Sequence, residues 1–248
     1  MSARCCSNEK RQDGMNTKED IKRNIERILA ELGDRARLLA ATKTLPPELI
    51  NYAADCGVTL IGENRVDELL AKYDAIDKER LEIHFIGHLQ SNKVKYIIDK
   101  VSMIHSVDSL SLAREIEKQA SKRDLVMPVL IEVNIAGEAS KNGIPPEETE
   151  EFLEALGQFP HLSVRGLMTI PPKTDLPEEN LQFFQKIYQK FIDIRAKKED
   201  NRRWEILSAG MSGDYLCAVD CGANLVRIGS AIFGKRPPLH PAGSTEGK

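Results

Sequence analysis

The sequence has no long apolar run, and this absence argues against both a membrane-spanning protein and a secreted one. No segment approaches the roughly 18 consecutive apolar residues that a membrane-spanning helix needs. Residues 1–15 are polar and lack the apolar stretch of a secretory signal peptide. We therefore expect a cytoplasmic protein with no membrane partner.

The sequence also lacks an excess of positive charge and lacks cysteines paired at Cys-x-x-Cys spacing. The 35 basic residues nearly balance the 38 acidic ones, so the chain lacks the positive excess with which nucleic-acid-binding domains neutralise phosphates. The five cysteines are odd in number and form no Cys-x-x-Cys pair. Cys217 and Cys221 stand four residues apart without a His or Cys partner at ligand spacing nearby, which favours two small buried residues over a metal site. We expect neither a metal nor a nucleic-acid partner.

Hydrophobic residues make up 41% of the chain and follow two alternating patterns. Thr17 to Asp20 predicts a capping box, and apolar residues at helical spacing follow it until Gly33. Short runs rich in Val, Ile and Leu then predict strands near 37–43, 58–63, 82–87, 102–107, 127–135, 163–170, 204–209 and 225–230. Helical patterns separate them, near 47–56, 65–75, 90–99, 109–122, 147–158, 178–197 and 213–221.

Strict alternation of strands and helices is typical of parallel strands joined by right-handed crossovers. Eight strand–helix units in about 250 residues match a (β/α)8 barrel, and the chain lacks the Gly-x-Gly-x-x-Gly turn of a doubly wound sheet. We therefore predict an α/β fold: a single (β/α)8 TIM-type barrel over 16–235, with an extra N-terminal helix. Residues 1–15 are predicted to be a disordered leader and 236–248 a flexible tail.

The active face of such a barrel lies at the carboxyl ends of its strands. Alternation along the first strand places Leu39, Ala41 and Lys43 on one face, with Lys43 at the barrel mouth. A lysine desolvated there loses its proton more readily than in water, and a neutral amine can form a Schiff base with a carbonyl. A solvated lysine that ends a strand fits the same pattern.

The last predicted strand carries an inward-facing cation. Alternation places Arg227 on the interior face, where a guanidinium needs an acceptor such as a carboxylate, a phosphate or a ring nitrogen. A structural ion pair would satisfy it equally well. Gly229 and Ser230 follow directly, in the region where barrels often bind phosphate.

Other predicted strand ends are polar as well. Ser208 and Ser212 bring hydroxyl groups to the end of the seventh strand, and Ser212 is equally suited to cap the next helix. Glu63 and Asn64 end the second strand, where helix capping and hydrogen bonding at the barrel rim are the simpler interpretation. His84 and His88 are four residues apart on one face of a predicted strand, where we expect no metal site, and His105, His161 and His240 are interpreted as isolated residues.

Taken together, the strand ends resemble the pyridoxal phosphate homeostasis protein family over roughly residues 17–235. The motifs that carry the resemblance are Ala40-Ala41-Thr42-Lys43-Thr44, Gly62-Glu63-Asn64, His84-Phe85-Ile86-Gly87-His88-Leu89-Gln90-Ser91-Asn92-Lys93, Gly166-Leu167-Met168, Leu207-Ser208-Ala209-Gly210-Met211-Ser212 and Arg227-Ile228-Gly229-Ser230-Ala231-Ile232-Phe233-Gly234. That family is similar in fold to the barrel domain of alanine racemase.

The resemblance implies a site for pyridoxal 5′-phosphate (PLP). It implies that Lys43 forms a covalent imine with the cofactor and that Arg227 faces the pyridine nitrogen. The other residues that it brings to the cofactor are Ser208, Ser212, Gly229 and Ser230 at the phosphate, and Asn64 and Met168 near the ring.

The resemblance also implies a function. An arginine keeps its proton and therefore meets an unprotonated pyridine nitrogen, which leaves the ring a weak electron sink. We expect no second domain and no partner-supplied tyrosine of the kind that alanine racemase uses. The resemblance thus implies a monomer that stores, buffers or delivers PLP with little or no catalytic activity, and apo-enzymes that need PLP are its candidate partners. Two alternatives stay open: a PLP-dependent racemase-like enzyme or Schiff-base lyase that uses Lys43, and a scaffold that senses the cofactor.

Overall fold

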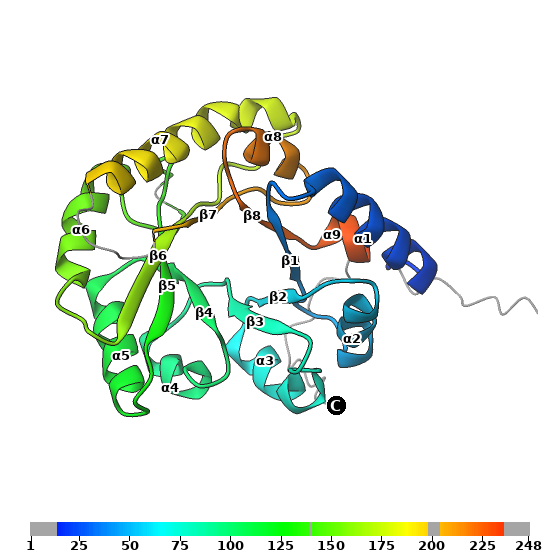
Figure 1. Cartoon of the computed structure of the whole chain (residues 1–248), viewed down its shortest axis with the longest axis horizontal. Helices are drawn as coiled ribbons and strands as arrows, with labels where there is room; N and C mark the ends of the chain where they lie inside the picture. Colours follow the sequence, from blue (N-terminus) through cyan, green and yellow to red (C-terminus); the bar gives the residue numbers. More distant parts are fainter. Residues whose placement is uncertain (1–13, 139, 198–203, 236–248) are drawn as a thin grey trace, which may run out of the picture.

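The strands of the computed structural model close into a barrel. The structure describes residues 14–138, 140–197 and 204–235, and within them parallel strands follow one another in sequence order from β1 to β8, with β8 paired to β1. Helices form an outer ring around the strands, with α5 and α6 on one side and α1 and α2 on the other (Figure 1). The predicted α/β barrel is confirmed. The predicted leader, 1–15, is described only at residues 14 and 15, where Met15 forms a bridge with Gly234, and the rest of it and the predicted tail, 236–248, lie outside the described residues.

Every predicted strand is present in the structure. The strands are β1 (Arg37–Ala41), β2 (Leu60–Glu63), β3 (Glu82–Phe85), β4 (Met103–Val107), β5 (Met127–Glu132), β6 (Leu162–Met168), β7 (Ile206–Ser208) and β8 (Leu225–Ile228). Most end earlier than predicted, because the last one to three predicted residues leave the ladder and turn into the loops of the barrel mouth. Lys43, for example, follows the end of β1.

The predicted helices are also present, and several begin with a short 3-10 turn. The helices are α1 (Lys18–Leu32), α2 (Pro47–Asp55), α3 (Val66–Lys72), α4 (Val94–Ile97), α5 (Leu110–Ser121), α6 (Thr149–Leu156), α7 (Leu181–Lys197), α8 (Tyr215–Asp220) and α9 (Ser230–Phe233). The 3-10 turns η2 (Ser91–Lys93), η3 (Pro146–Glu148) and η4 (Pro177–Asn180) precede α4, α6 and α7, whereas η1 (Tyr73–Ala75) follows α3.

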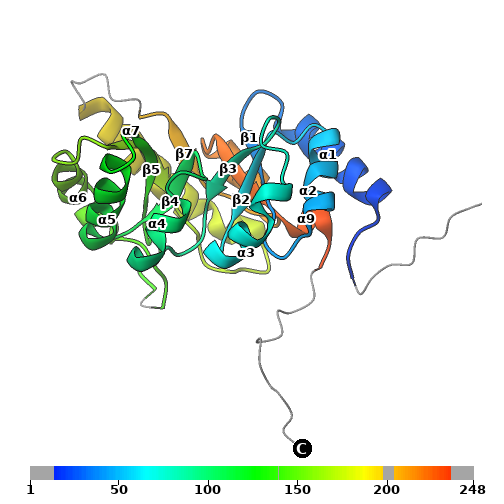
Figure 2. The same cartoon turned by 90° about the horizontal axis from the view of Figure 1, so that it is seen from below.

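Helix α1 begins with the predicted capping box. The Thr17 hydroxyl accepts from the Asp20 amide at 3.2 Å, and the Asp20 carboxylate accepts from the Thr17 amide at 3.3 Å. Its buried stripe packs against α2 and α9, and α9 lies beside it in both views (Figures 1 and 2). The Asn16 and Asn24 side chains both donate to the backbone oxygen of Ile232, at 2.8 and 3.2 Å. The extra N-terminal helix therefore anchors α9, which continues from the end of β8.

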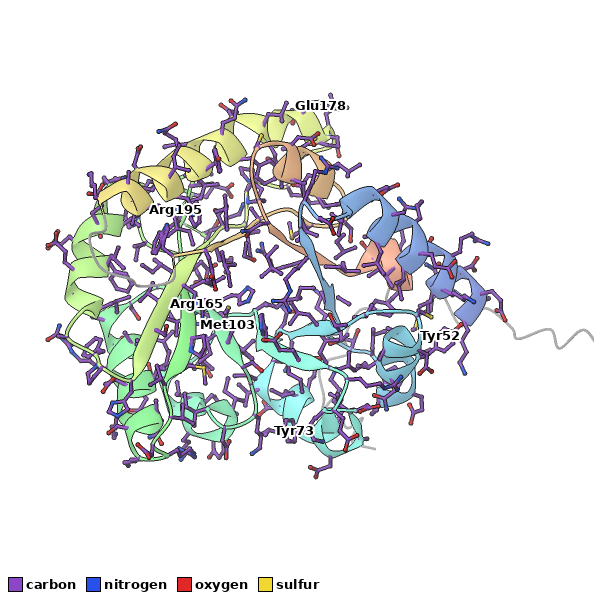
Figure 3. The ribbon with its side chains drawn as sticks, viewed as in Figure 1. Tyr52, Tyr73, Met103, Arg165, Glu178 and Arg195 are labelled. Carbon is purple, nitrogen blue, oxygen red and sulfur yellow. The ribbon has the colours of Figure 1, made fainter. Side chains whose placement is uncertain are left out.

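The apolar core has one layer outside the strands and smaller clusters inside the barrel. The outer layer joins the barrel to its helices, and the interior clusters are Leu39, Leu60, Ile86 and Leu225, and Met103, Leu130 and Met168. Met103 thus lies on the inner side of the barrel wall, whereas Tyr52 and Tyr73 lie among the outer helices (Figure 3). The barrel interior also holds buried polar side chains, among them His84, His105, Ser208 and Arg227.

Candidate functional site

A cavity of about 670 Å³ opens at the carboxyl ends of the strands, with Lys43, Arg227 and Ser212 in its wall. Gly229 and Ser230 line it as well, so five of the eight residues predicted at the cofactor share one cavity. The loop between β6 and α7 forms the opposite wall through residues 170–175. Residues that are far apart in the chain therefore meet where the strand-end argument predicted a site.

The backbone around Lys43 is clamped from behind by a buried ion pair. Lys72 on α3 places its Nζ 2.7 Å from Glu63 Oε1 and donates to the Thr42 backbone oxygen at 2.8 Å. The Thr42 hydroxyl donates to the same Glu63 carboxylate. Burial raises the pKa of the Glu63 carboxyl, and the Lys72 ammonium opposes that rise. The clamp fixes the residue that immediately precedes Lys43.

A second contact holds the residue that follows Lys43. The Thr44 amide donates to Glu68 Oε2 at 2.8 Å, and Thr44 adopts a φ of 62°, in the left-handed region. Glu68, like Lys72, belongs to α3. Helix α3 therefore sets the backbone on both sides of Lys43, while the Lys43 side chain itself is exposed at the cavity.

Ser212 joins the loop after β7 to the start of α9. Its hydroxyl oxygen accepts from the Gly229 amide at 3.2 Å and from the Ala231 amide at 3.1 Å. The alternative role of Ser212 as the cap of the next helix is not the one that forms, because Asp214 occupies the position before α8. The two amides converge on one acceptor oxygen, an arrangement that is also suited to an anionic oxygen.

Arg227 is buried, with 4% of its surface exposed, and it lines the cavity floor. Nη1 donates to the Ser208 hydroxyl at 2.6 Å and Nη2 to the Thr169 backbone oxygen at 2.8 Å. Both acceptors are neutral. The guanidinium is therefore held by hydrogen bonds to neutral groups and not by a structural ion pair. Burial lowers the Arg227 pKa to about 10, and the more distant Glu132 and Asp214 carboxylates oppose this. Arg227 therefore stays charged at neutral pH.

Three residues predicted at the cofactor lie outside the cavity wall. Ser208 is fully buried inside the barrel, where its hydroxyl meets Arg227; its contact with a phosphate stays a prediction. Met168 is fully buried in an interior apolar cluster with Met103. Asn64 is half-buried after β2, and its backbone lies so close to Gly87 that a Cβ there would approach the Asn64 oxygen to 2.2 Å.

The interpretation of His105 as an isolated residue is wrong. His105 Nε2 lies 2.9 Å from His84 Nδ1, and His105 Nδ1 lies 3.3 Å from the Ser208 hydroxyl. Strands β3 and β4 pair with His84 opposite Met103, which brings the two rings together inside the barrel. Alternation along a strand predicts that each of these residues faces the barrel interior. It does not predict which residues of the two strands lie opposite each other.

Sequence reasoning also missed a carboxyl group inside the barrel. Glu132, at the end of β5, is only 7% exposed. Burial raises its pKa to about 7, the nearby Asp108 carboxylate adds to the rise, and Arg227 opposes it. Glu132 therefore exists in both its neutral and its charged form near neutral pH.

Cys217 and Cys221 are half-buried free thiols on and just after α8, and burial raises the pKa of both. Within residues 14–138, 140–197 and 204–235, no group of three or more His, Cys, Asp or Glu side chains is arranged to hold a metal ion.

The sequence matches the model of the alanine racemase N-terminal domain over residues 17–237. It is 45% identical to the pyridoxal phosphate homeostasis protein of Aquifex aeolicus, in an alignment that covers 90% of this chain and 99% of that protein. The protein of the same name from Vibrio alginolyticus is 36% identical, with 87% and 97% covered.

Solved structures share the fold. An unknown protein from Bifidobacterium adolescentis matches with a TM-score of 0.82 and 34% identity, over 87% of this chain and 95% of that one. PipY of Synechococcus elongatus PCC7942, with PLP bound, matches with a TM-score of 0.79 and 29% identity, over 86% and 100%. Alanine racemase of Clostridium difficile, at 17% identity and a TM-score of 0.68, shows the fold alone.

Proposed function

Since the chain belongs to the pyridoxal phosphate homeostasis protein family, we propose that it binds PLP at the barrel mouth and takes part in the homeostasis of this cofactor. The observation that carries the proposal is the meeting of Lys43, Ser212, Arg227, Gly229 and Ser230 around one cavity. PipY, a relative with the same fold, has been solved with PLP bound. Storage, buffering and delivery of PLP are the forms of homeostasis that one open site supports.

The chemistry of the cavity residues fits the three functional groups of PLP. Lys43 supplies a primary amine for the aldehyde. The Gly229 and Ala231 amides, which already converge on the Ser212 oxygen, suit the phosphate. Arg227 supplies a donor for the pyridine nitrogen. When bound, PLP would supply an aldehyde that the Lys43 amine could hold as an imine with release of water, and enclosure in the cavity would shield it from free amines.

Arg227 disfavours reactions that need a strong electron sink, such as transamination, and permits at most racemase-like proton exchange. Its guanidinium only donates hydrogen bonds, and with a pKa of about 10 it retains its proton at neutral pH. The pyridine nitrogen that it contacts therefore stays unprotonated, and the ring withdraws few electrons from any attached amine. We infer little or no catalytic activity, and no observation on this chain favours the racemase or lyase alternative.

The location and partners of the protein form part of the same proposal. No helix in the described part of the chain is long and apolar enough to cross a membrane. We infer that the protein works in the cytoplasm as a monomer and that apo-enzymes needing PLP are its partners.

The visible absorbance of the purified protein tests the proposal. Incubation with PLP is expected to give a yellow band that borohydride removes, with the reduced adduct mapping to Lys43. Lys43→Ala is expected to lack the band, whereas Lys173→Ala, which changes another lysine of the cavity wall, should keep it. A protein that stays colourless with PLP would overturn the proposal. Turnover of amino acids at ordinary enzymatic rates would replace storage with the racemase alternative.

A further inference from the structure

Five buried or half-buried polar side chains form a continuous hydrogen-bonded chain through the barrel, here called the polar chain: Glu82, His84, His105, Ser208 and Arg227. It begins at Glu82, the first residue of β3, at the amino ends of the strands. It ends at Arg227, beside the cavity at the opposite mouth. The side chains come from β3, β4, β7 and β8.

When the His84 and His105 rings are both neutral, every donor of the polar chain meets an acceptor in one arrangement of the protons. Arg227 can only donate, so the Ser208 oxygen accepts at 2.6 Å and its hydroxyl proton is left for His105 Nδ1 at 3.3 Å. His105 then carries its proton on Nε2 and donates to His84 Nδ1 at 2.9 Å. His84 likewise carries its proton on Nε2 and donates to the Glu82 carboxylate at 3.0 Å.

The competing arrangement needs one more proton. A cationic His84 would donate to both neighbours, which would turn His105 into the tautomer with its proton on Nδ1. His105 would then donate toward Ser208, and the serine oxygen would face two donors. Burial lowers the pKa of His84, although the Glu82 carboxylate opposes this, and burial, His84 and Arg227 together lower the pKa of His105. The charged form of the pair is therefore disfavoured.

We propose that His84 and His105 are positioning residues of the PLP site, which keep the Ser208 hydroxyl turned toward His105 so that its oxygen accepts from Arg227. This inference rests on the proposed function for its ligand, but the polar chain itself does not need the cofactor. With Nη1 bonded to Ser208 and Nη2 to the Thr169 oxygen, two anchor points fix the rotation of the guanidinium beside the cavity. The histidines thus act on the ring nitrogen through Arg227 and touch no cofactor atom themselves.

The tautomers can be observed directly. Two-bond ¹H–¹⁵N spectra of the full chain labelled at histidine, recorded at pH 7 with and without PLP, are expected to show His84 and His105 as neutral rings protonated on Nε2. Loss of one signal set in His84→Gln and in His105→Gln assigns the two rings. A cationic His84, or a His105 protonated on Nδ1, would overturn the proposal.

Substitutions of His105 measure how the polar chain affects the binding of PLP. His105→Phe removes the acceptor of the Ser208 proton and is expected to weaken PLP affinity about tenfold, the usual effect of one lost hydrogen bond. It should also move the absorbance maximum of the bound cofactor. His105→Gln, which keeps a donor and an acceptor, should recover part of both changes.

Two controls separate positioning from packing. Met103→Leu alters the interior next to the polar chain without touching its hydrogen bonds, and His161→Gln removes a histidine that pairs with Glu117 outside the polar chain. Both variants should bind PLP like the unchanged protein.

Unchanged affinity and absorbance in a folded His105→Phe would refute the inference. If His105→Phe does not fold, the tautomer spectra decide. Failure of the unchanged protein to bind PLP would instead refute the proposed function.

Discussion

Buried side chains in this barrel keep or lose their charge according to their neighbours. Glu82 and Glu132 both belong to strands that line the interior, yet the His84 hydrogen bond holds the Glu82 pKa at about 2, whereas burial raises the Glu132 pKa to about 7. Glu82 is half-buried and contacts both His84 and Arg37, whereas Glu132 is buried, and these two differences together explain the opposite shifts. Glu132 is therefore a group whose protonation state links pH to stability.

Glu132→Gln is expected to flatten the pH dependence of the unfolding free energy. The folded state holds the Glu132 proton more tightly than the unfolded state, whose carboxyl keeps the ordinary pKa of 4.5. Stability from this group is therefore present below about pH 4.5 and is lost as the pH rises through about 7, by up to about 3 kcal/mol. Urea denaturation between pH 5 and pH 8 measures the slope. Glu147→Gln, at an exposed position, should leave it unchanged, and equal slopes in the two variants would contradict the expectation.

Loops at the barrel mouth depend on the helices behind them. Lys72 of α3 reaches the backbone before Lys43, and the Asp214 carboxylate accepts from the Met211 amide at 2.7 Å and from the Asn180 side chain at 2.9 Å. Such contacts join each loop to a neighbouring element. Residues that contact no cofactor should therefore still affect the cavity.

Lys72→Met is expected to destabilise the protein by about 3–5 kcal/mol, because it leaves the fully buried Glu63 carboxylate without its counter-ion. The double variant with Glu63→Leu should recover much of this loss. Lys93→Met breaks the Lys93–Asp67 pair at the surface of the same region and should cost less than about 1 kcal/mol. Chemical denaturation measures all three, and equal losses for Lys72→Met and Lys93→Met would exclude a role for the clamp.

Gly210→Ala should destabilise the loop that carries Ser212. Gly210 has a φ of +90°, and a Cβ would approach the Ala218 Cβ to 2.7 Å and the Tyr215 Cα to 2.9 Å. The backbone strain and overlap predict a loss of about 2–4 kcal/mol. Gly213→Ala in the same loop meets nothing within 4 Å and should be nearly neutral. Thermal unfolding of the two variants compares them, and similar melting temperatures would count against this account of the loop.

The closed barrel brings the two ends of the described chain together. Met15 forms a bridge with Gly234, β1 pairs with β8, and α1 packs against α9. Closure leaves the cavity bounded by residues from the first strand to the last. Ligand binding there should stabilise the molecule as a unit, because anything that binds only the folded state shifts the unfolding equilibrium.

PLP is expected to raise the melting temperature, with a gain of about 2.7 kcal/mol at a concentration about 100 times the Kd. Pyridoxine 5′-phosphate, which has the ring and phosphate but no aldehyde, should give a smaller shift because it cannot react with Lys43. Lys43→Ala should respond equally to the two ligands. Calorimetry measures the shifts. If PLP and its alcohol analogue stabilise the unchanged protein to the same extent, attachment through Lys43 is ruled out.

The order of the strands and helices, the barrel, and the location of Lys43, Arg227, Gly229 and Ser230 at one mouth were all predictable from the sequence. Hydrophobic periodicity is a local property, and a parallel barrel brings every strand's carboxyl end to the same face. The capping box before α1 was predictable for the same reason, since its bonds span three residues. Local spacing also showed which residues face inward.

Contacts between inward-facing residues were decided only by the tertiary structure. The bond between His105 and Ser208 joins residues 103 positions apart, and no local pattern specifies it. The Lys72–Glu63 pair and the raised pKa of Glu132 likewise depend on which side chains become neighbours and how much water they lose. Sequence periodicity determined the face on which each side chain lies, whereas strand register and closure of the barrel determined its partner, because both bring distant segments together in space.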